Sequence, residues 1–269
     1  MESGTINTNG QELYYEVHGD GPPLVLIMGI GLDSTLWGLR QLPAFSKAFQ
    51  VIAFDNRDAG RSSQASAPYT IADMAEDTAG LLGGLGIDRT HMLGHSMGGM
   101  IAMEFALSHP ERLDKLVLSG TTAGSGRAKF DPVSIMSFVA QHDSEGLTTA
   151  AQQLIWYFST DFLRNHQAVE ETLALFGSNP NPMTADGFER QAQAYASHDA
   201  LDRIGEIGVP TLVLTGEQDR LVPPWLGREI ADAIPGAEFH LVEGSGSSHA
   251  ALLERPDDYN KVVVSFLSE

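Results

Sequence analysis

Short apolar runs recur along the chain, and longer stretches with helical spacing separate them. The runs are rich in branched residues, and glycine or a small polar residue follows most of them. Continuous apolar runs are typical of strands that are buried on both faces of a parallel sheet. The predicted strands cover residues 24–28, 51–54, 91–93, 115–118, 211–214 and 237–242.

Amphipathic helices are predicted between these strands. Apolar residues repeat at intervals of three and four over residues 71–85, and Gly86 ends the pattern. A second helix is predicted over residues 97–108. Strands that alternate with helices indicate an α/β protein with a mostly parallel, doubly wound sheet. Residues 12–18 alternate in polarity and predict an antiparallel strand at its edge.

Residues 125–205 interrupt this alternation, because they show helical patterns and no convincing strand. The stretch contains nine of the 21 aromatic residues in under a third of the chain. Such residues could simply hold an inserted segment on the main domain, and they would also suit an apolar lid over a pocket. We predict an α/β core from residues 1–124 and 206–269 and a helical cap from residues 125–205. Its apolar helix faces are predicted to contain Ile135, Phe138 and Val139, and Leu154, Ile155, Phe158 and Phe162.

Composition and charge narrow the possible partners. The chain has 269 residues and no cysteine, so its core needs no disulfides and thiol catalysis is excluded. A net charge of −19 disfavours binding to nucleic acids and anionic membranes. A neutral small molecule is favoured, since a dianionic substrate would need Arg127, Arg164 or Arg190 at the pocket. The missing secretion signal favours the cytoplasm, and a monomer and a homodimer both stay open.

The motif Gly94-His95-Ser96-Met97-Gly98 lies between a predicted strand and a predicted helix. The motif alone is weak, but this position makes it specific. A serine at a tight strand-to-helix turn has a strained backbone, and flanking glycines let neighbouring backbones pass closely. The turn would hold the Ser96 hydroxyl at a helix N-terminus, where free N–H groups favour negative charge. Ser96 is therefore predicted to be a nucleophile.

A serine nucleophile needs a base, and the base needs an orienting carboxylate. His249 follows the glycine- and serine-rich residues 244–248, whose loop could bring it over the sheet. Asp219 comes soon after the strand 211–214, at the edge where open parallel sheets place ligands. Glu217 is the nearest rival for the role of the acid. Ser96, Asp219 and His249 form the predicted triad.

Acyl transfer also needs hydrogen-bond donors for the oxyanion. The backbone N–H groups of Met97 and Ile30 are predicted to serve, the second from the loop after the first core strand. Phe138, Trp156 and Val222 are expected to line the substrate pocket. This chemistry requires neither a metal nor an organic cofactor.

Several further segments are similar to motifs of the α/β-hydrolase family, and the likeness covers nearly the whole chain. They are Phe54 to Ser62, Tyr69 to Asp77, His109 to Leu113, Gly216 to Pro224, and His249 with Glu254-Arg255-Pro256. The order serine, acid, histidine also agrees with this family. The chain most resembles small capped esterases and lactonases, such as 3-oxoadipate enol-lactonase and aclacinomycin methylesterase.

This resemblance implies a serine hydrolase that cleaves a carboxylic ester or lactone of a small, largely neutral apolar substrate through an acyl-enzyme. Two departures stand out: Met28-Gly29 replaces a common His-Gly, and the loop before His249 is longer than usual. Hydrolysis of carbon–carbon bonds or thioesters and perhydrolysis use the same triad and stay open. A non-catalytic ligand receptor on the same fold is the remaining alternative.

Overall fold

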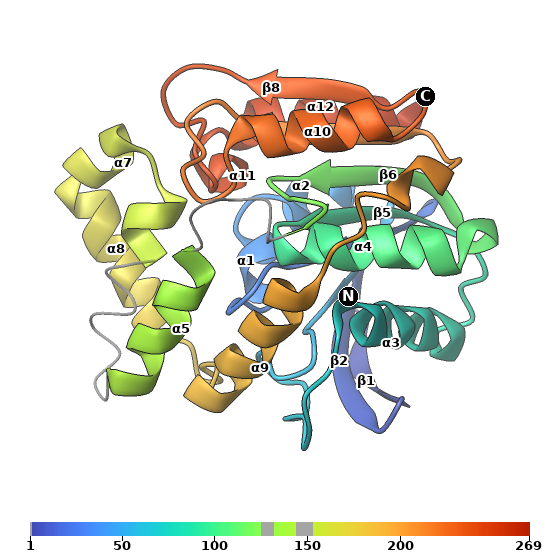
Figure 1. Ribbon diagram of the computed structural model, residues 1–269, viewed down its shortest axis with the longest axis horizontal. Coiled ribbons are helices and arrows are strands. Elements are labelled where there is room, and N and C mark those ends of the chain that lie inside the picture. Colours follow the sequence, from blue (N-terminus) through green and yellow to red (C-terminus); the bar gives the residue numbers. More distant parts are fainter. Residues whose placement is uncertain (1, 125–131, 144–152) are drawn as a thin grey trace.

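The computed structural model describes residues 2–124, 132–143 and 153–269. They form one eight-stranded sheet with helices on both faces (Figure 1). The strand order is β1-β2-β4-β3-β5-β6-β7-β8. β2 pairs antiparallel with β1 and β4, and the pairs from β4 to β8 are parallel. The predicted α/β class with a doubly wound, mostly parallel sheet is confirmed. The strands are β1 (Glu2–Thr8), β2 (Gln11–His18), β3 (Pro23–Ile27), β4 (Gln50–Phe54), β5 (Thr90–His95), β6 (Leu113–Ser119), β7 (Thr211–Gly216) and β8 (Glu238–Val242).

Helices cover both faces of the sheet, and the continuous apolar strands supply a core to each. In β3, Val25 and Ile27 belong to one core, whereas Leu24 and Leu26 belong to the other. The first core includes residues of α3 (Ile71–Gly84), α4 (Met97–Ser108) and α10 (Pro224–Ala233), which lie in front of the sheet in Figure 1. The second includes residues of α1 (Thr35–Gly38), α2 (Leu42–Phe45) and α12 (Pro256–Ser268). Strand side chains alternate between faces, so each run of apolar residues serves both cores.

The two predicted core helices are confirmed as α3 and α4. Thr70 and Asp73 form a reciprocal capping box at the start of α3, which explains why the helix begins there. Three further short elements of the core are η1 (Pro110–Arg112), η3 (Ile204–Glu206) and α11 (Ala251–Glu254). Within the described ranges, no helix is both long and apolar enough to cross a bilayer.

One strand prediction was wrong in its position. The alternating segment 12–18 is β2, which lies second from the edge, and β1 is the edge strand. β1 carries the sequence ESGTINT, and its side chains are exposed or only half-buried. An edge strand with one neighbour needs few apolar residues, so hydrophobic patterning could not detect it.

Helices also occupy the region predicted as a cap. They are α5 (Pro132–His142), α7 (Thr160–Arg164), α8 (His166–Gly177) and α9 (Ala185–Ser197), and residues 153–157 are helical as well. α5, α7 and α8 lie beyond the end of the sheet to which the arrows of β6 and β8 point (Figure 1). This is the carboxyl edge of the parallel strands, where open sheets of this type bind ligands.

The predicted apolar faces of this region need correction. In α5, Val133 and Met136 are buried, whereas Ile135 is 42% and Phe138 is 65% exposed. The helix carries two apolar stripes, and the stripe with Val133 and Met136 packs inward, where α5 contacts α9. In the other predicted face, Leu154 and Phe158 are buried and Phe162 is half-buried, but Ile155 is exposed. Helical periodicity alone does not show which of two stripes meets the core.

A buried carboxylate joins α4 to the chain that returns from the helical region. Glu104 accepts hydrogen bonds from Arg203, and its Oε1 lies 3.0 Å from His198 Nε2. Burial alone would raise the pKa of Glu104, but the hydrogen bonds from His198 and Arg203 outweigh it and lower this pKa to about 2. A depressed carboxyl pKa stabilises the fold above the unfolded-state pKa, and this stabilisation is lost as the pH falls.

Glu104→Gln is expected to lower the free energy of unfolding at pH 7 by about 2 kcal/mol, because it removes charge-assisted hydrogen bonds. The difference from the wild type should shrink as the pH falls from about 4.5 towards about 2, where the wild-type carboxylate becomes protonated. Urea denaturation of both proteins at several pH values measures this difference. A difference in the free energy of unfolding that stays constant over this pH range would contradict the lowered pKa of Glu104.

Candidate active site

Ser96 occupies a strained turn between β5 and α4. Its backbone has φ 57° and ψ −124°, a conformation that non-glycine residues rarely adopt. Glycine is required at positions 94 and 98, because other backbone atoms pass too close to leave room for a side chain. A Cβ on Gly94 would lie 2.2 Å from the Gly98 carbonyl oxygen, and a Cβ on Gly98 would lie 2.1 Å from that of Ile27. The local geometry therefore agrees with the predicted nucleophile turn.

The structure joins His249 to Asp219. The His249 Nδ1 lies 2.8 Å from Asp219 Oδ2, and both side chains are buried. The other carboxylate oxygen, Oδ1, accepts the backbone N–H groups of Leu221 at 2.9 Å and Val222 at 2.7 Å. With Oδ1 held by the backbone, Oδ2 is oriented towards the imidazole. The rival acid Glu217 is exposed and accepts the Gly244 N–H instead.

Ser96 and His249 line the same cavity, so the structure brings the predicted nucleophile and base together. No hydrogen bond joins the Ser96 hydroxyl to His249 in the described residues. Such bonds are often long in sites without substrate and shorten when substrate binds.

Two aromatic rings that the sequence did not indicate pack against the imidazole. The ring centroid of His95 lies 4.8 Å from that of His249, and that of Tyr157 lies 5.6 Å away. Burial and the nearby His249 lower the pKa of His95 well below its usual value, and burial raises that of Tyr157. Both rings lie at a tilt to the imidazole, with interplanar angles of 43° for His95 and 41° for Tyr157, and they pack against His249 from two elements. Tyr157 comes from the region predicted as a cap, and its neighbour Trp156 was one of the three residues expected near the substrate.

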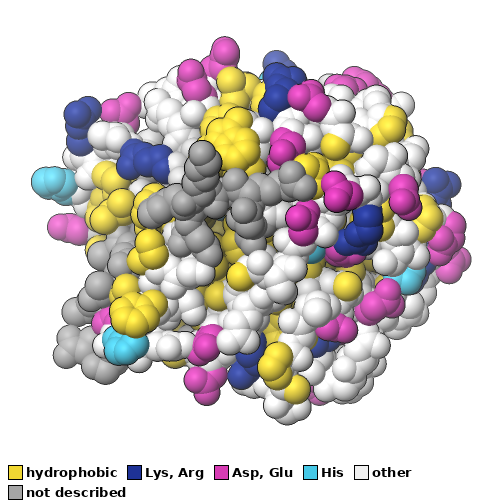
Figure 2. Space-filling view, viewed as in Figure 1, with side chains coloured by type: hydrophobic (Ala, Val, Ile, Leu, Met, Phe, Trp, Pro, Cys, Tyr) yellow, Lys and Arg dark blue, Asp and Glu magenta, His cyan; other side chains and the backbone are white. Residues whose placement is uncertain are grey.

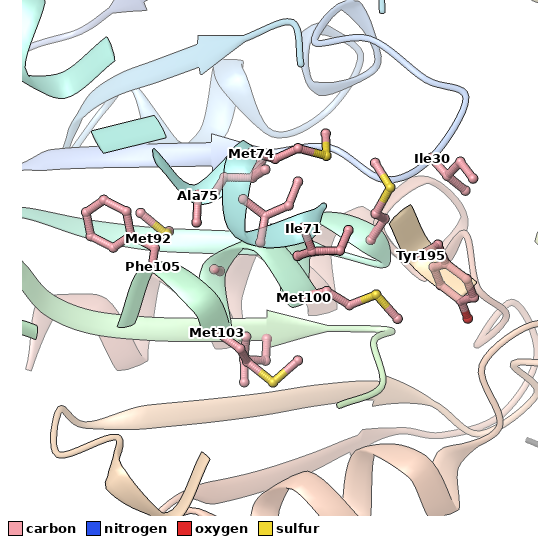
Figure 3. Close-up of a cluster of buried hydrophobic side chains, with 14 of the residues drawn as sticks. Ile30, Ile71, Met74, Ala75, Met92, Met100, Met103, Phe105 and Tyr195 are labelled. Carbon is pink, nitrogen blue, oxygen red and sulfur yellow. The ribbon is translucent and has the colours of Figure 1, made fainter. Parts of the chain in front are cut away.

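The loop after β3 lies against the nucleophile. A Cβ on Gly29 would lie 2.8 Å from Ser96 Cβ, so only glycine permits this approach. Ile30 follows it, and Met97 is the first residue of α4. Among the described residues, none accepts a hydrogen bond from either backbone N–H. Figure 3 shows Ile30 and Tyr195 at the same end of the buried cluster, far from Phe105.

The cavity beside Ser96 is narrow, with a volume of about 20 Å³, and its lining is mostly apolar. A wider hollow of about 810 Å³ lies next to it, and the two share Leu32, Leu36 and Phe176 in their linings. None of the described residues that line either space is lysine or arginine. Besides these three, the inner cavity is lined by Gly29, Ile30, His95, Ser96, Tyr157, Phe158, His249, Ala250, Leu252 and Leu253.

Neither the inner cavity nor the wider hollow has Phe138, Trp156 or Val222 in its described lining, although these three residues were expected to line the pocket. Phe138 is exposed and packs on His142, Trp156 is half-buried, and Val222 is buried in the core. Val222 instead contributes its backbone N–H to Asp219. An aromatic residue on a helix of the predicted cap can face solvent as easily as a cavity, and the sequence does not distinguish these orientations.

Two of the three arginines considered for an anionic substrate are engaged elsewhere. Arg164 pairs with Asp161 at the surface, and Arg190 makes two hydrogen bonds with the buried Asp58. Arg127 lies outside the described residues. Figure 2 shows acidic side chains across the right half of the visible face, in keeping with the net charge.

Hydrogen bonds join the long loop before His249 to the region predicted as a cap. The half-buried Glu254 accepts hydrogen bonds from the N–H and hydroxyl of Ser159 and from the hydroxyl of Ser248. The Ala250 N–H donates to the Tyr157 carbonyl oxygen at 2.8 Å. Ser245 and Ser247 of the loop also donate hydrogen bonds, to Asp161 and to the Gly244 carbonyl oxygen, so these contacts hold the longer loop next to His249.

A match to a known protein family decides the identity of the fold. Residues 22–256 match the family described as alpha/beta hydrolase fold. The chain belongs to this family. A Burkholderia xenovorans LB400 enol-lactonase structure is 30% identical to this hydrolase, with a TM-score of 0.88 over 99% of this chain and 100% of that one. A thermophilic esterase from Thermogutta terrifontis is 28% identical, with a TM-score of 0.86 over 100% and 98% of the two chains.

A relative from Caulobacter sp. (strain K31), which bears the name carbamate hydrolase RutD, is 31% identical to this hydrolase over 277 residues. The match covers 100% of this chain and 98% of the relative. The resemblance to esterases and lactonases is thus confirmed at the level of the family. The names of the relatives span more than one type of substrate, so they establish a hydrolase and no single substrate class.

Proposed function

We propose that this hydrolase cleaves a carboxylic ester or lactone of a small, largely neutral apolar substrate through an acyl-enzyme. The observation that carries the proposal is the pairing of His249 Nδ1 with Asp219, in a cavity that also holds Ser96 at its strained turn. This combination of nucleophile, base and orienting acid is suited to acyl transfer.

In this mechanism, His249 removes the proton of Ser96 while the hydroxyl oxygen attacks the carbonyl carbon of the substrate. Asp219 fixes the tautomer of the imidazole and stabilises its cationic form. The N–H groups of Met97 and Ile30 donate to the oxyanion. The alcohol leaves with a proton from His249, and a water activated by the same residue releases the acid.

The composition of the cavity supports a neutral substrate. A carboxylate that leaves water for an apolar cavity loses its hydration, and the described lining supplies no cation to compensate. A dianionic enol-lactone would require lysine or arginine at the pocket, and neither is found among the described lining residues. The proposal includes the division into an α/β core and a cap. Residues 125–205 would form the cap and cover the site, since Tyr157, Phe158 and Phe176 line the cavity.

The neutral ester p-nitrophenyl butyrate is expected to have a kcat/KM about tenfold or more above that of p-nitrophenyl hemisuccinate, which adds a carboxylate to a similar acyl chain. A series of acyl lengths, neutral lactones and an aryl carbamate measured alongside would define the pocket and the reaction. Faster turnover of the anionic ester would overturn the proposed preference for neutral substrates. Turnover of the carbamate alone would overturn the assignment to esters and lactones.

A further inference from the structure

One buried amide joins the cap region to the loop that holds Ile30. Gln191 lies on α9 with no exposed surface. Its Oε1 accepts the Gly31 N–H at 3.0 Å, and its Nε2 donates to the Arg57 carbonyl oxygen at 3.0 Å. Both ends of the amide are therefore satisfied, and the side chain bridges two core loops.

The Gly31 amide is directly attached to Ile30 through a planar peptide bond. The Ile30 N–H lies in the preceding peptide plane, and only the two backbone rotations of Ile30 separate the two planes. A fixed Gly31 amide therefore restricts the rotations that would turn the Ile30 N–H away. Gly31 has φ +76°, and a Cβ there would lie 2.8 Å from the ring of Phe188, also on α9. From the opposite side, Ser96 lies against Gly29. The three-residue loop is thus held between the nucleophile and α9.

We propose that Gln191 is a positioning residue for the oxyanion hole. This inference rests on the proposed function, because it assigns Gln191 to the donor that would stabilise the oxyanion. By accepting the Gly31 N–H, Gln191 keeps the loop oriented so that the Ile30 N–H points at the position of the oxyanion. The core supplies the donor, and the cap region supplies the side chain that fixes it.

Gln191→Met preserves the length of the side chain and removes both hydrogen bonds. It is expected to lower kcat for p-nitrophenyl butyrate by about 10- to 100-fold, since a lost oxyanion donor costs about 10²- to 10³-fold and a misdirected one costs less. KM should stay within about twofold, because the Michaelis complex carries no oxyanion. Affinity for an alkyl trifluoromethyl ketone, which forms a tetrahedral adduct with a nucleophilic serine, should fall in parallel with kcat.

Gln193→Met is the matched control, because this glutamine lies on the same helix and is exposed to solvent. Its kcat and melting temperature should equal those of the wild type. If Gln191→Met does not fold, Gln191→Asn serves, since an amide shorter by about 1.5 Å cannot reach both partners. It should lower kcat in the same way.

An unchanged kcat in a folded Gln191 variant, or a rise in KM that accounts for the whole loss, would overturn the positioning role and leave the proposed function intact. A wild-type protein that neither turns over the ester nor binds the ketone would overturn both.

Discussion

Ser96→Ala is expected to lower kcat for ester hydrolysis by about 10⁴- to 10⁶-fold, because no other hydroxyl occupies the strained turn. The alanine lacks only one oxygen atom, and the turn depends on Gly94 and Gly98 rather than on the hydroxyl. The far-UV circular dichroism spectrum should therefore match that of the wild type. Turnover of p-nitrophenyl butyrate measures the loss.

A second measurement separates an enzyme from a receptor on the same fold. A fluorophosphonate probe should label the wild-type protein at Ser96 and leave the alanine variant unlabelled, since only an activated serine reacts. If the variant keeps near-normal esterase rates, the nucleophile is elsewhere. If the wild type is neither labelled nor active, the site does not perform acyl transfer.

Asp219→Asn is expected to lower kcat by about 10⁴-fold, because it would change the tautomer of His249. In the wild type, Oδ1 accepts two backbone N–H groups, from Leu221 and Val222. An asparagine would keep its oxygen on these donors and would turn its NH₂ group towards His249 Nδ1. This nitrogen would then have to accept a hydrogen bond, so the proton would move to Nε2, where the base must be free.

Glu217→Gln provides the comparison for the acid. Glu217 is exposed and contacts the Gly244 N–H, which a glutamine oxygen can also accept. Its kcat should stay within a few-fold of the wild type. Both variants are assayed over the same pH range, and a larger loss in the glutamine variant would transfer the role of the acid to Glu217.

Much of the fold and several candidate site residues could be predicted because their signals are local. A strand buried on both faces must be apolar throughout, so β3 to β7 were visible as short runs. The turn at Ser96 requires glycines at fixed spacing, since Gly94 and Gly98 contact backbone atoms. The loops that carry Asp219 and His249 follow strands that end at the same edge of the sheet.

The features that were missed depend on partners far apart in the chain. β1 is polar because it lies at the edge, and the inward stripe of α5 is chosen by its contact with α9. Gln191 and Tyr157 look like ordinary helix residues in the sequence. Their roles come from contacts with Gly31 and His249, and no local pattern encodes these contacts.

The hydrogen bonds between Glu254, Ser159 and Ser248 have a consequence for protein engineering. A chimaera that received residues 125–205 from another hydrolase would lose the serine that Glu254 binds, while the glutamate and the histidine loop would stay with the host. Donor segments should therefore be exchanged together with their own residues at 248 and 254. Grafts made in this way should retain turnover more often than grafts of the helices alone.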